Sequence, residues 1–225
     1  MSRRLHVTAI LVLSLGASRT GGAQRLAPRK REFWIAGTLS MAAVIPFDEK
    51  IREYFSGSHT PLLDRVATPV GDAGSPRFIL PVLLAGAIVP RTLHDPATSN
   101  AIVDVGLGYV VTSVAGSLAR RVVGRHRPDS TGHTGRFSPF RREPMWHSFP
   151  SGHVLGVMSL ATGISIKANR PWVTTTTFGL ASLVAIQRLY EQKHWASDVV
   201  AGTMFGIAAS ASTIRWREHD RARHD

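Results

Sequence analysis

The chain has 225 residues, of which 44% are hydrophobic, so it is long enough for one domain and too apolar for a disordered protein. Lysine and arginine number 27 against 15 acidic residues, giving a net charge of +12. The natural partner of such a chain is a polyanion, an anionic membrane or a phosphorylated substrate. Cysteine is absent, which excludes disulfide scaffolds, thiolate metal sites and a cysteine nucleophile.

The N-terminus has the order of an export signal. Residues 1–4 carry two arginines, residues 5–15 form an apolar run, and a small-residue stretch ends at Ala23. This order predicts a signal peptide over 1–23, followed by a basic linker over 24–32. The alternative is an uncleaved anchor or tail; the apolar run is itself too short to cross a bilayer, which takes about 20 residues.

Downstream, apolar segments alternate with polar ones, and their length and lack of strict alternation favour helices. The sequence predicts an all-α domain over 33–214: a bundle of five to six mostly membrane-embedded helices with the active site at one end, followed by a basic charged tail over 215–225. Gly202 and Gly206 have the four-residue spacing that lets membrane helices approach closely. A soluble helical core is the alternative. The segments are 33–47, 78–90, 101–119, 154–166, 172–186 and 195–214.

The first polar cluster follows the apolar segment 101–119. Between residues 120 and 142 the chain has seven arginines and a single acid, Asp129. Arg120 and Arg127 are two helical turns apart and share one face if the helix persists. Because the planar guanidinium group matches phosphate oxygens, the cluster indicates an anion site. Taken alone, it is equally consistent with a solvated basic loop or with contact to anionic lipid head groups.

The second cluster is Phe-Pro-Ser-Gly-His at 149–153, directly before the apolar segment 154–166. Ser151 has the position of a helix N-cap, and the free N–H groups of the first turn then form a ready anion site. His153 at its mouth can deliver a proton. The alternative is an ordinary helix cap with a histidine that faces water.

The third cluster combines Arg188, His194 and Asp198 at the junction of the last two apolar segments. His194 and Asp198 are four residues apart, so they meet on one helical turn. An aspartate on one imidazole nitrogen would fix the tautomer and leave the other nitrogen free to attack. The alternative is a polar pair that stabilises a helix start, although an ionisable group in an apolar segment is usually functional or paired.

In an up-and-down bundle, the three clusters lie at the same end. Together they supply arginines for oxyanions, backbone N–H groups at a helix start, one nucleophilic histidine and one acidic histidine. These are the groups that transfer a phosphoryl group without a metal.

The three clusters resemble the motifs of the type 2 phosphatidic acid phosphatase (PAP2) superfamily, which includes lipid phosphate phosphatases, class A acid phosphatases and vanadium haloperoxidases. The matching parts are Arg-x6-Arg-Pro at 120–128, Pro-Ser-Gly-His at 150–153 and Arg-x5-His-x3-Asp at 188–198. The resemblance covers about residues 33–214. Two positions depart from the commonest pattern: Arg120 replaces a lysine, and Gln187 replaces a serine.

The resemblance implies a role for each motif residue. His194 attacks phosphorus and forms a phosphohistidine, Asp198 orients His194, and His153 protonates the leaving oxygen. No metal and no cofactor is implied. The phosphate oxygens are held by Arg120, Arg127, Arg188, the Ser151 hydroxyl and the Gly152 amide.

The predicted function is therefore a metal-independent phosphatase that hydrolyses a phosphate monoester or diphosphate, with a lipid phosphate such as phosphatidic acid or a polyprenyl diphosphate as substrate. The loop over 129–147 is expected to set the choice of substrate. Two alternatives stay open: a vanadium-haloperoxidase-like oxidoreductase and a soluble periplasmic non-specific acid phosphatase. A nucleic acid is not the expected partner, because the export signal and the apolar segments do not fit such a binder.

Charge asymmetry predicts the orientation in a membrane. Lys167 and Arg170 in the short link after 154–166, together with the basic tail over 215–225, fit the cytoplasmic side. We therefore expect a bacterial-type inner membrane protein whose active site faces the periplasm or the exterior. If the signal is cleaved, this orientation requires five spans, with the segment 33–47 not crossing.

Overall fold

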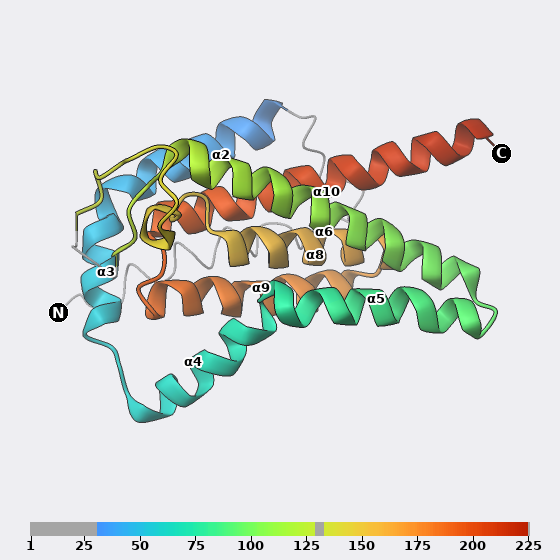
Figure 1. Ribbon diagram of the computed structural model, residues 1–225, viewed down its shortest axis with the longest axis horizontal. Helices are drawn as coiled ribbons and strands as arrows, with labels where there is room; N and C mark the ends of the chain where they lie inside the picture. Colours follow the sequence, from blue (N-terminus) through green and yellow to red (C-terminus); the bar gives the residue numbers. More distant parts are fainter. Residues whose placement is uncertain (1–30, 129–132, 225) are drawn as a thin grey trace.

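The computed structural model of the chain describes residues 31–128 and 133–224, which form an all-helical bundle (Figure 1). The predicted signal peptide over 1–23 lies outside the described residues, as do most of the basic linker and residues 129–132 of the predicted specificity loop. The expectation of an all-α fold is confirmed.

Every apolar segment predicted from the sequence is helical in the structure. The segment 33–47 covers α2 and the 3₁₀ turn η2, and each later segment falls within one helix to within a residue. Two helices between them, α3 and α4, were not predicted. In chain order the elements are α2 (Arg31–Val44), η2 (Ile45–Phe47), α3 (Asp48–Ser56), α4 (Pro61–Ala73), α5 (Pro76–Thr92), α6 (Pro96–Val123), η3 (Pro144–Trp146), α8 (Gly152–Ala168), α9 (Pro171–Tyr190) and α10 (Ala196–His224).

Local sequence signals set several helix ends. Helices α4, α5, α6 and α9 each begin with proline in the first turn, where its missing N–H costs nothing. The Thr60 hydroxyl caps α4, and the Asp95 carboxylate caps α6 by accepting from the Thr98 N–H at 3.1 Å. Helix α6 ends at Gly124, whose φ of 59° lies in the left-handed region that glycine adopts most readily.

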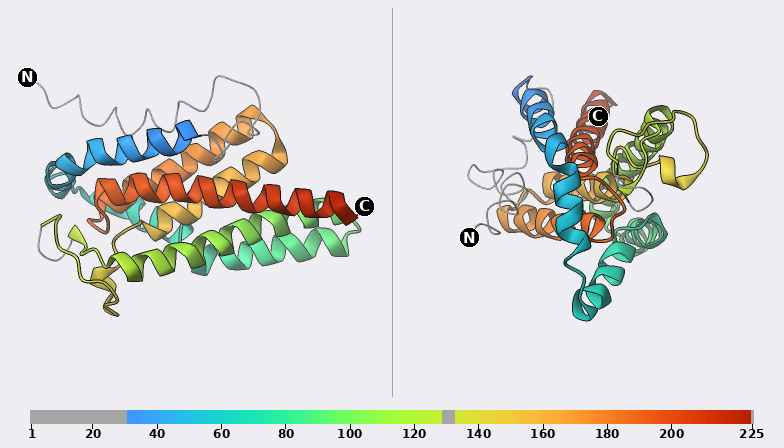
Figure 2. Two further views of the ribbon diagram at one scale, coloured as in Figure 1. Left: turned by 90° about the horizontal axis from the view of Figure 1, so that it is seen from above. Right: turned by 90° about the vertical axis from the view of Figure 1, so that its left-hand side faces the viewer.

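Helix α8 lies at the centre of the bundle and packs mainly against α10, α9 and α6 (Figure 2). Glycines permit the closest of these contacts. A Cβ at Gly202 would lie 2.8 Å from the carbonyl oxygen of Ser151, and one at Gly206 would lie 2.6 Å from that of Leu155. The spacing of the two glycines therefore does bring the α10 backbone against α8, as predicted.

An ion-pair cluster joins three helices at the end of the bundle where α8 ends. Asp104 of α6 is fully buried and pairs with Lys167 of α8 at 2.8 Å and with Arg217 of α10 at 3.2 Å; Arg221 also binds it. The segment 215–225, predicted as a separate tail, is instead the last part of α10 as far as residue 224. Two of its arginines, Arg217 and Arg221, pair with the buried Asp104, which ties this part of α10 to α6.

The outer faces of several helices expose large apolar side chains. By length and composition α6 is able to cross a membrane, and α4 and α5, which meet at a 49° bend, qualify together as one further span. Exposed apolar residues on these and neighbouring helices include Leu62, Phe78, Val82, Leu84, Ile88, Val114, Leu118, Trp172, Leu180 and Leu183. Such a surface suits lipid better than water.

Candidate active site

Four helix ends meet at one end of the bundle. The C-terminal ends of α6 and α9 and the N-terminal ends of α8 and α10 all lie on the left in Figure 1, where α3 crosses them. Each of the three sequence clusters lies at one of these ends, so the structure brings the clusters together as expected. The helix of the first cluster stops at Gly124, however. The condition under which Arg120 and Arg127 would share one helical face is therefore not met, although their charges still interact electrostatically.

The loop after α6 is held by backbone hydrogen bonds that place the second half of the first motif. The Arg127 N–H donates to the Met145 carbonyl at 2.8 Å, and the Ser148 N–H donates to the Arg125 carbonyl at 3.0 Å. This loop therefore carries Arg127 back toward the start of α8, although it is no longer helical there.

The start of α8 presents polar atoms that have no partner. Ser151 is the N-cap residue, yet its fully buried hydroxyl makes no capping bond and no other hydrogen bond. Next to it, Gly152 lies so close to the guanidinium of Arg120 that a Cβ would be 2.5 Å from Nη1. That Nη1 atom is also buried and without a hydrogen-bond partner. Buried donors normally find acceptors, so their convergence on a helix N-terminus indicates an anion-binding site.

Arg188 is held in place from two sides. Its Nε donates to the side-chain oxygen of Gln187 at 2.5 Å, and its Nη2 donates to Glu191 at 3.2 Å. On the α4 side, Gly71 leaves no room for a Cβ because the side chains of Arg188 and Gln187 lie against it. Gln187, which departs from the family pattern, thus orients the Arg188 guanidinium here.

His194 is buried in the loop between α9 and α10, and its Nδ1 lies 2.8 Å from the carbonyl oxygen of Ser148. Because a carbonyl oxygen only accepts, Nδ1 carries the hydrogen and Nε2 keeps its lone pair. The nearest oxygen of Asp198 is 3.9 Å from Nδ1, too far for a hydrogen bond. The group that fixes the tautomer is therefore a backbone carbonyl, in contrast to the expected contact with Asp198.

The electrostatic surroundings keep both histidines of the site neutral. Burial, reinforced by the charges of Arg127 and Arg188, holds the pKa of His194 well below its ordinary value of 6.5. His153 lies in the first turn of α8, ahead of the apolar segment 154–166. Burial and the charges of Arg188, Arg127 and Arg120 lower its pKa to about 4. These shifts also mean that the three arginines and two histidines act on one another across a single site.

Asp198 belongs to a buried polar network that sequence reasoning missed. It accepts from Arg125 at 2.6 Å, from the Ser148 hydroxyl at 2.5 Å and from the Trp195 N–H at 3.0 Å. The other arm of the Arg125 guanidinium binds Asp48 of α3 at 2.8 Å. Asp198 therefore acts on His194 through Ser148. The Ser148 hydroxyl donates to Asp198, and the Ser148 carbonyl accepts the hydrogen bond from Nδ1 of His194.

Asp48 also ties α3 to the start of α10. Its two carboxylate oxygens accept from the N–H of Ser197 at 2.9 Å and from the hydroxyl of Ser197 at 2.5 Å. Asp48 and Arg125 are 1% and 5% exposed, so the ion pair is isolated from water. In the sequence, Arg125 is one of the arginines of the first cluster, which gave a signal for its role near the site. No sequence pattern pointed to Asp48.

Across residues 31–128 and 133–224, no three histidine, cysteine, aspartate or glutamate side chains gather in a way that could hold a metal ion.

Fold and site together define the class of this protein: an all-α bundle with an oxyanion-binding site and two histidines at one end. The sequence profile of the PAP2 superfamily matches residues 101–222, which is just over half of the chain and contains all three motifs. The chain therefore belongs to the PAP2 superfamily.

Individual proteins show similarity over part of their length. A lipid A 1-phosphatase of Rhizobium etli is 31% identical over 129 residues, which cover 54% of this chain and 54% of that protein. An undecaprenyl-diphosphatase of Sulfolobus acidocaldarius is 30% identical over 110 residues, which cover 48% of this chain and 52% of that protein. This chain thus spans about half the length of these two relatives. The crystal structure of a transmembrane PAP2-type phosphatidylglycerolphosphate phosphatase from Bacillus subtilis has the same fold, with a TM-score of 0.59 at 22% identity over 84% of this chain and 95% of that one.

Proposed function

We propose that this protein is a membrane-embedded phosphatase that hydrolyses a lipid phosphate or diphosphate through a phosphohistidine on His194, without a metal ion. The observation that carries the proposal is the pair of buried, unpartnered donors at the start of α8, the Ser151 hydroxyl and Arg120 Nη1. They face the same site as a neutral, buried histidine whose Nε2 is free. The family membership and the lipid-phosphate substrates in the names of the relatives support the choice of reaction.

In the first step, the Nε2 lone pair of His194 attacks phosphorus, an N–P bond forms, and the P–O bond to the leaving group breaks. The electron pair of that bond stays on the leaving oxygen, which takes the proton of His153. Arg120 and the Ser151 hydroxyl, with Arg127, Arg188 and the Gly152 N–H, hold the equatorial oxygens where negative charge is concentrated.

In the second step, water attacks phosphorus and His153 takes the proton that the water loses. The N–P bond breaks, and its electron pair returns to Nε2 of His194. In both steps the Ser148 carbonyl accepts a hydrogen bond from Nδ1–H of His194. This bond stabilises the positive charge of the imidazole ring while phosphate is attached to it.

His153 has to gain its proton when the substrate binds. Burial, together with the charges of three arginines, lowers the pKa of His153 to about 4, so the ring is neutral at pH 7. A bound phosphate dianion offsets those charges and stabilises the imidazolium. Alternatively, a phosphate monoanion binds next to neutral His153 and brings the proton itself. Proton transfer from the phosphate to His153 within the complex then gives the same dianion and imidazolium, so the two routes are equivalent.

Two experiments test the chemistry together. Activity on a panel of lipid phosphates, isoprenoid diphosphates and p-nitrophenyl phosphate should survive EDTA and be inhibited by vanadate, because arginines neutralise the phosphate. Complete loss of activity in EDTA, restored by Mg²⁺, would refute the metal-independent mechanism.

His194→Ala should abolish both phosphoenzyme formation and turnover. A His194→Ala enzyme that still forms a phosphoenzyme would place the nucleophile elsewhere.

We also propose that the site faces the periplasm or the exterior. Arg170 and the basic end of α10 lie at the end of the bundle opposite the site, where Lys167 is neutralised by Asp104 and Glu218. Because the chain has no cysteine, Phe140→Cys and Arg170→Cys, both at exposed positions, give clean reporters. An impermeant thiol reagent should label the cysteine at 140 alone in intact cells; labelling only at 170 would reverse the orientation.

A further inference from the structure

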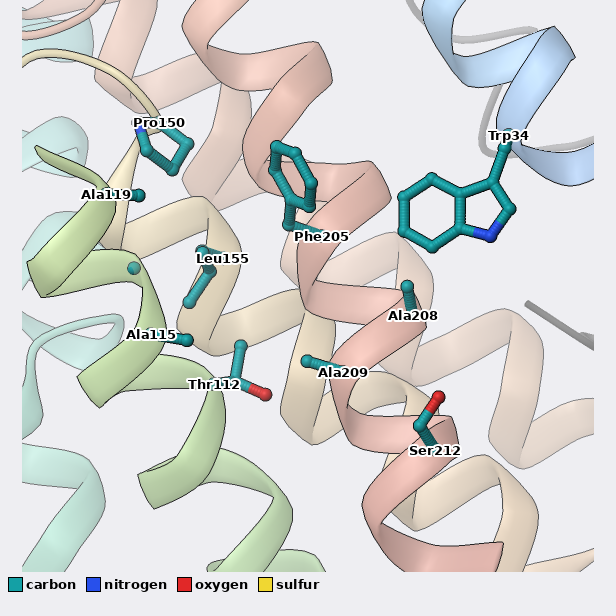
Figure 3. Close-up of a pocket in the computed structure, with 11 residues that line it drawn as sticks. Trp34, Thr112, Ala115, Ala119, Pro150, Leu155, Phe205, Ala208, Ala209 and Ser212 are labelled. Carbon is teal, nitrogen blue, oxygen red and sulfur yellow. The ribbon is translucent and has the colours of Figure 1, made fainter. Parts of the chain in front are cut away.

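An apolar groove runs along the bundle between α2, α6 and α10, and it has no role in the chemistry above. Its volume is about 360 Å³, within the ~300–1,000 Å³ range of small-molecule sites. Figure 3 shows Trp34 of α2 beside Phe205 of α10, with small side chains of α6 and α10 along the walls of the groove; the two ring centroids are 6.2 Å apart. The residues that shape it most are Trp34, Ala115, Ala119, Leu155, Phe205 and Ala209.

Apart from Phe205, the side chains on the two long walls of the groove are small. On α6 the lining runs from Thr112 to Ala119, and on α10 from Phe205 to Ser212. Each stretch rises about 10 Å at 1.5 Å per residue, so the groove follows the bundle axis for that distance. Its length and apolar walls suit an extended hydrocarbon chain that lies parallel to the helices.

One end of the groove reaches the phosphate site. Pro150, which lines the groove, directly precedes Ser151. Gly116 also lines the groove, and a Cβ there would be in van der Waals contact with Nη1 of Arg120, at 3.5 Å. This Nη1 is the atom without a hydrogen-bond partner at the phosphate site. An anion on Arg120 and a chain in the groove can therefore belong to one amphiphilic molecule.

We propose that this groove binds a hydrocarbon chain of the phosphorylated lipid whose head group occupies the arginine site. The inference rests on the proposed phosphatase function and adds the binding site for the acyl or prenyl chain of its substrate. The contact works by packing and positioning, because a chain displaced from the groove moves into lipid and not into water. The groove thus aligns the phosphorus with Nε2 of His194 more than it adds affinity.

The test fills the groove from a position that has space. Ala115 is exposed and lines the groove, so Ala115→Phe projects into it without entering the core. Its matched control is Val114→Phe, the neighbouring residue, which is 56% exposed and is not part of the lining. Ala209→Leu blocks the groove from the α10 side and serves as a second variant if Ala115→Phe fails to fold.

We expect Ala115→Phe to lower kcat/KM for long-chain phosphatidic acid by roughly three- to tenfold, the loss of packing contacts alone. Activity on p-nitrophenyl phosphate, which has no chain, should be unchanged, and Val114→Phe should match the unsubstituted protein on both substrates. Equal losses on both substrates, or no loss with either groove variant, would overturn the inference. An unsubstituted protein inactive on every phosphate would instead refute the proposed function.

Photolabelling separates a substrate chain from bulk lipid. A phosphatidic acid with a diazirine in its acyl chain should label the groove-facing stretches of α6 and α10, and vanadate should reduce this labelling by occupying the phosphate site. A diacylglycerol with the same acyl chain should label these stretches weakly. Equal labelling by both lipids, unaffected by vanadate, would mean that the groove holds only surrounding lipid and would contradict the inference.

Discussion

Replacing Arg125 with methionine should remove the cation that joins Asp48 and Asp198. Both carboxylates are almost completely buried, and Arg125 donates to them at 2.8 and 2.6 Å. Methionine fills much of the same volume but neutralises neither carboxylate. Removing one partner of a buried pair costs roughly 3–5 kcal/mol because the remaining charge is left without compensation.

This loss is large enough to measure in purified protein. For a chain of this size about 1 kcal/mol corresponds to roughly 2–4 °C in Tm, so Arg125→Met should melt roughly 6–20 °C lower. The matched control is Arg141→Met, which breaks an exposed pair with Glu143 at 3.2 Å. An exposed pair contributes about 0–1 kcal/mol, so the control should shift Tm by only a few degrees.

The same variant tests the connection to catalysis. Without Arg125, Asp198 loses one of its three donors and keeps only the Ser148 hydroxyl and the Trp195 N–H, so the carbonyl that orients His194 is held less firmly. We expect kcat to fall more than the folded fraction does, measured well below the new Tm. If Arg125→Met melts no lower than Arg141→Met, the buried pair contributes no stability and the reasoning is wrong.

The other predictions concern the site and the packing of α8. His153→Ala should cost roughly 10²–10⁴-fold on an alkyl phosphate and much less on p-nitrophenyl phosphate, whose leaving group needs no acid; an equal loss on both would remove the general-acid role. His153 has a pKa of about 4 and is neutral at pH 7, so in either proton route the reactive complex has one proton more than neutral His153 and the phosphate dianion. We therefore expect kcat/KM to fall about tenfold per pH unit above the second phosphate ionisation near pH 6. The acid limb, set by the lowered pKa of His194, should lie well below 6.5, and a rate that rises through pH 8 would contradict this assignment. Gly206→Ala should destabilise the protein by about 1–3 kcal/mol in a thermal melt, because its Cβ meets the Leu155 carbonyl. The control Gly106→Ala has open space around its Cβ and should be neutral or stabilising. Equal Tm values for the two variants would show that α10 can move aside.

Much of the fold could be read from local patterns. Apolar runs of helical length, prolines in first turns and capping residues such as Asp95 act within a few residues, so the chain itself specifies where the main helices lie. The candidate site followed from the same logic, because its motifs lie at helix ends and an up-and-down bundle brings those ends together. Helix α3 was missed because it has only nine residues and its apolar side chains, Ile51, Tyr54 and Phe55, are separated by charged ones and form no apolar run.

Tertiary structure alone decided how the site residues are supported. Asp48 and Ser197 are 149 positions apart, and no periodicity links an aspartate of α3 to the start of α10. The partner of His194 depended on the course of the loop before α8: a spacing of four predicted Asp198, but folding placed the Ser148 carbonyl closer. A sequence pattern specifies contacts along one helix, whereas contacts between segments depend on how whole helices pack, which no short stretch of residues encodes.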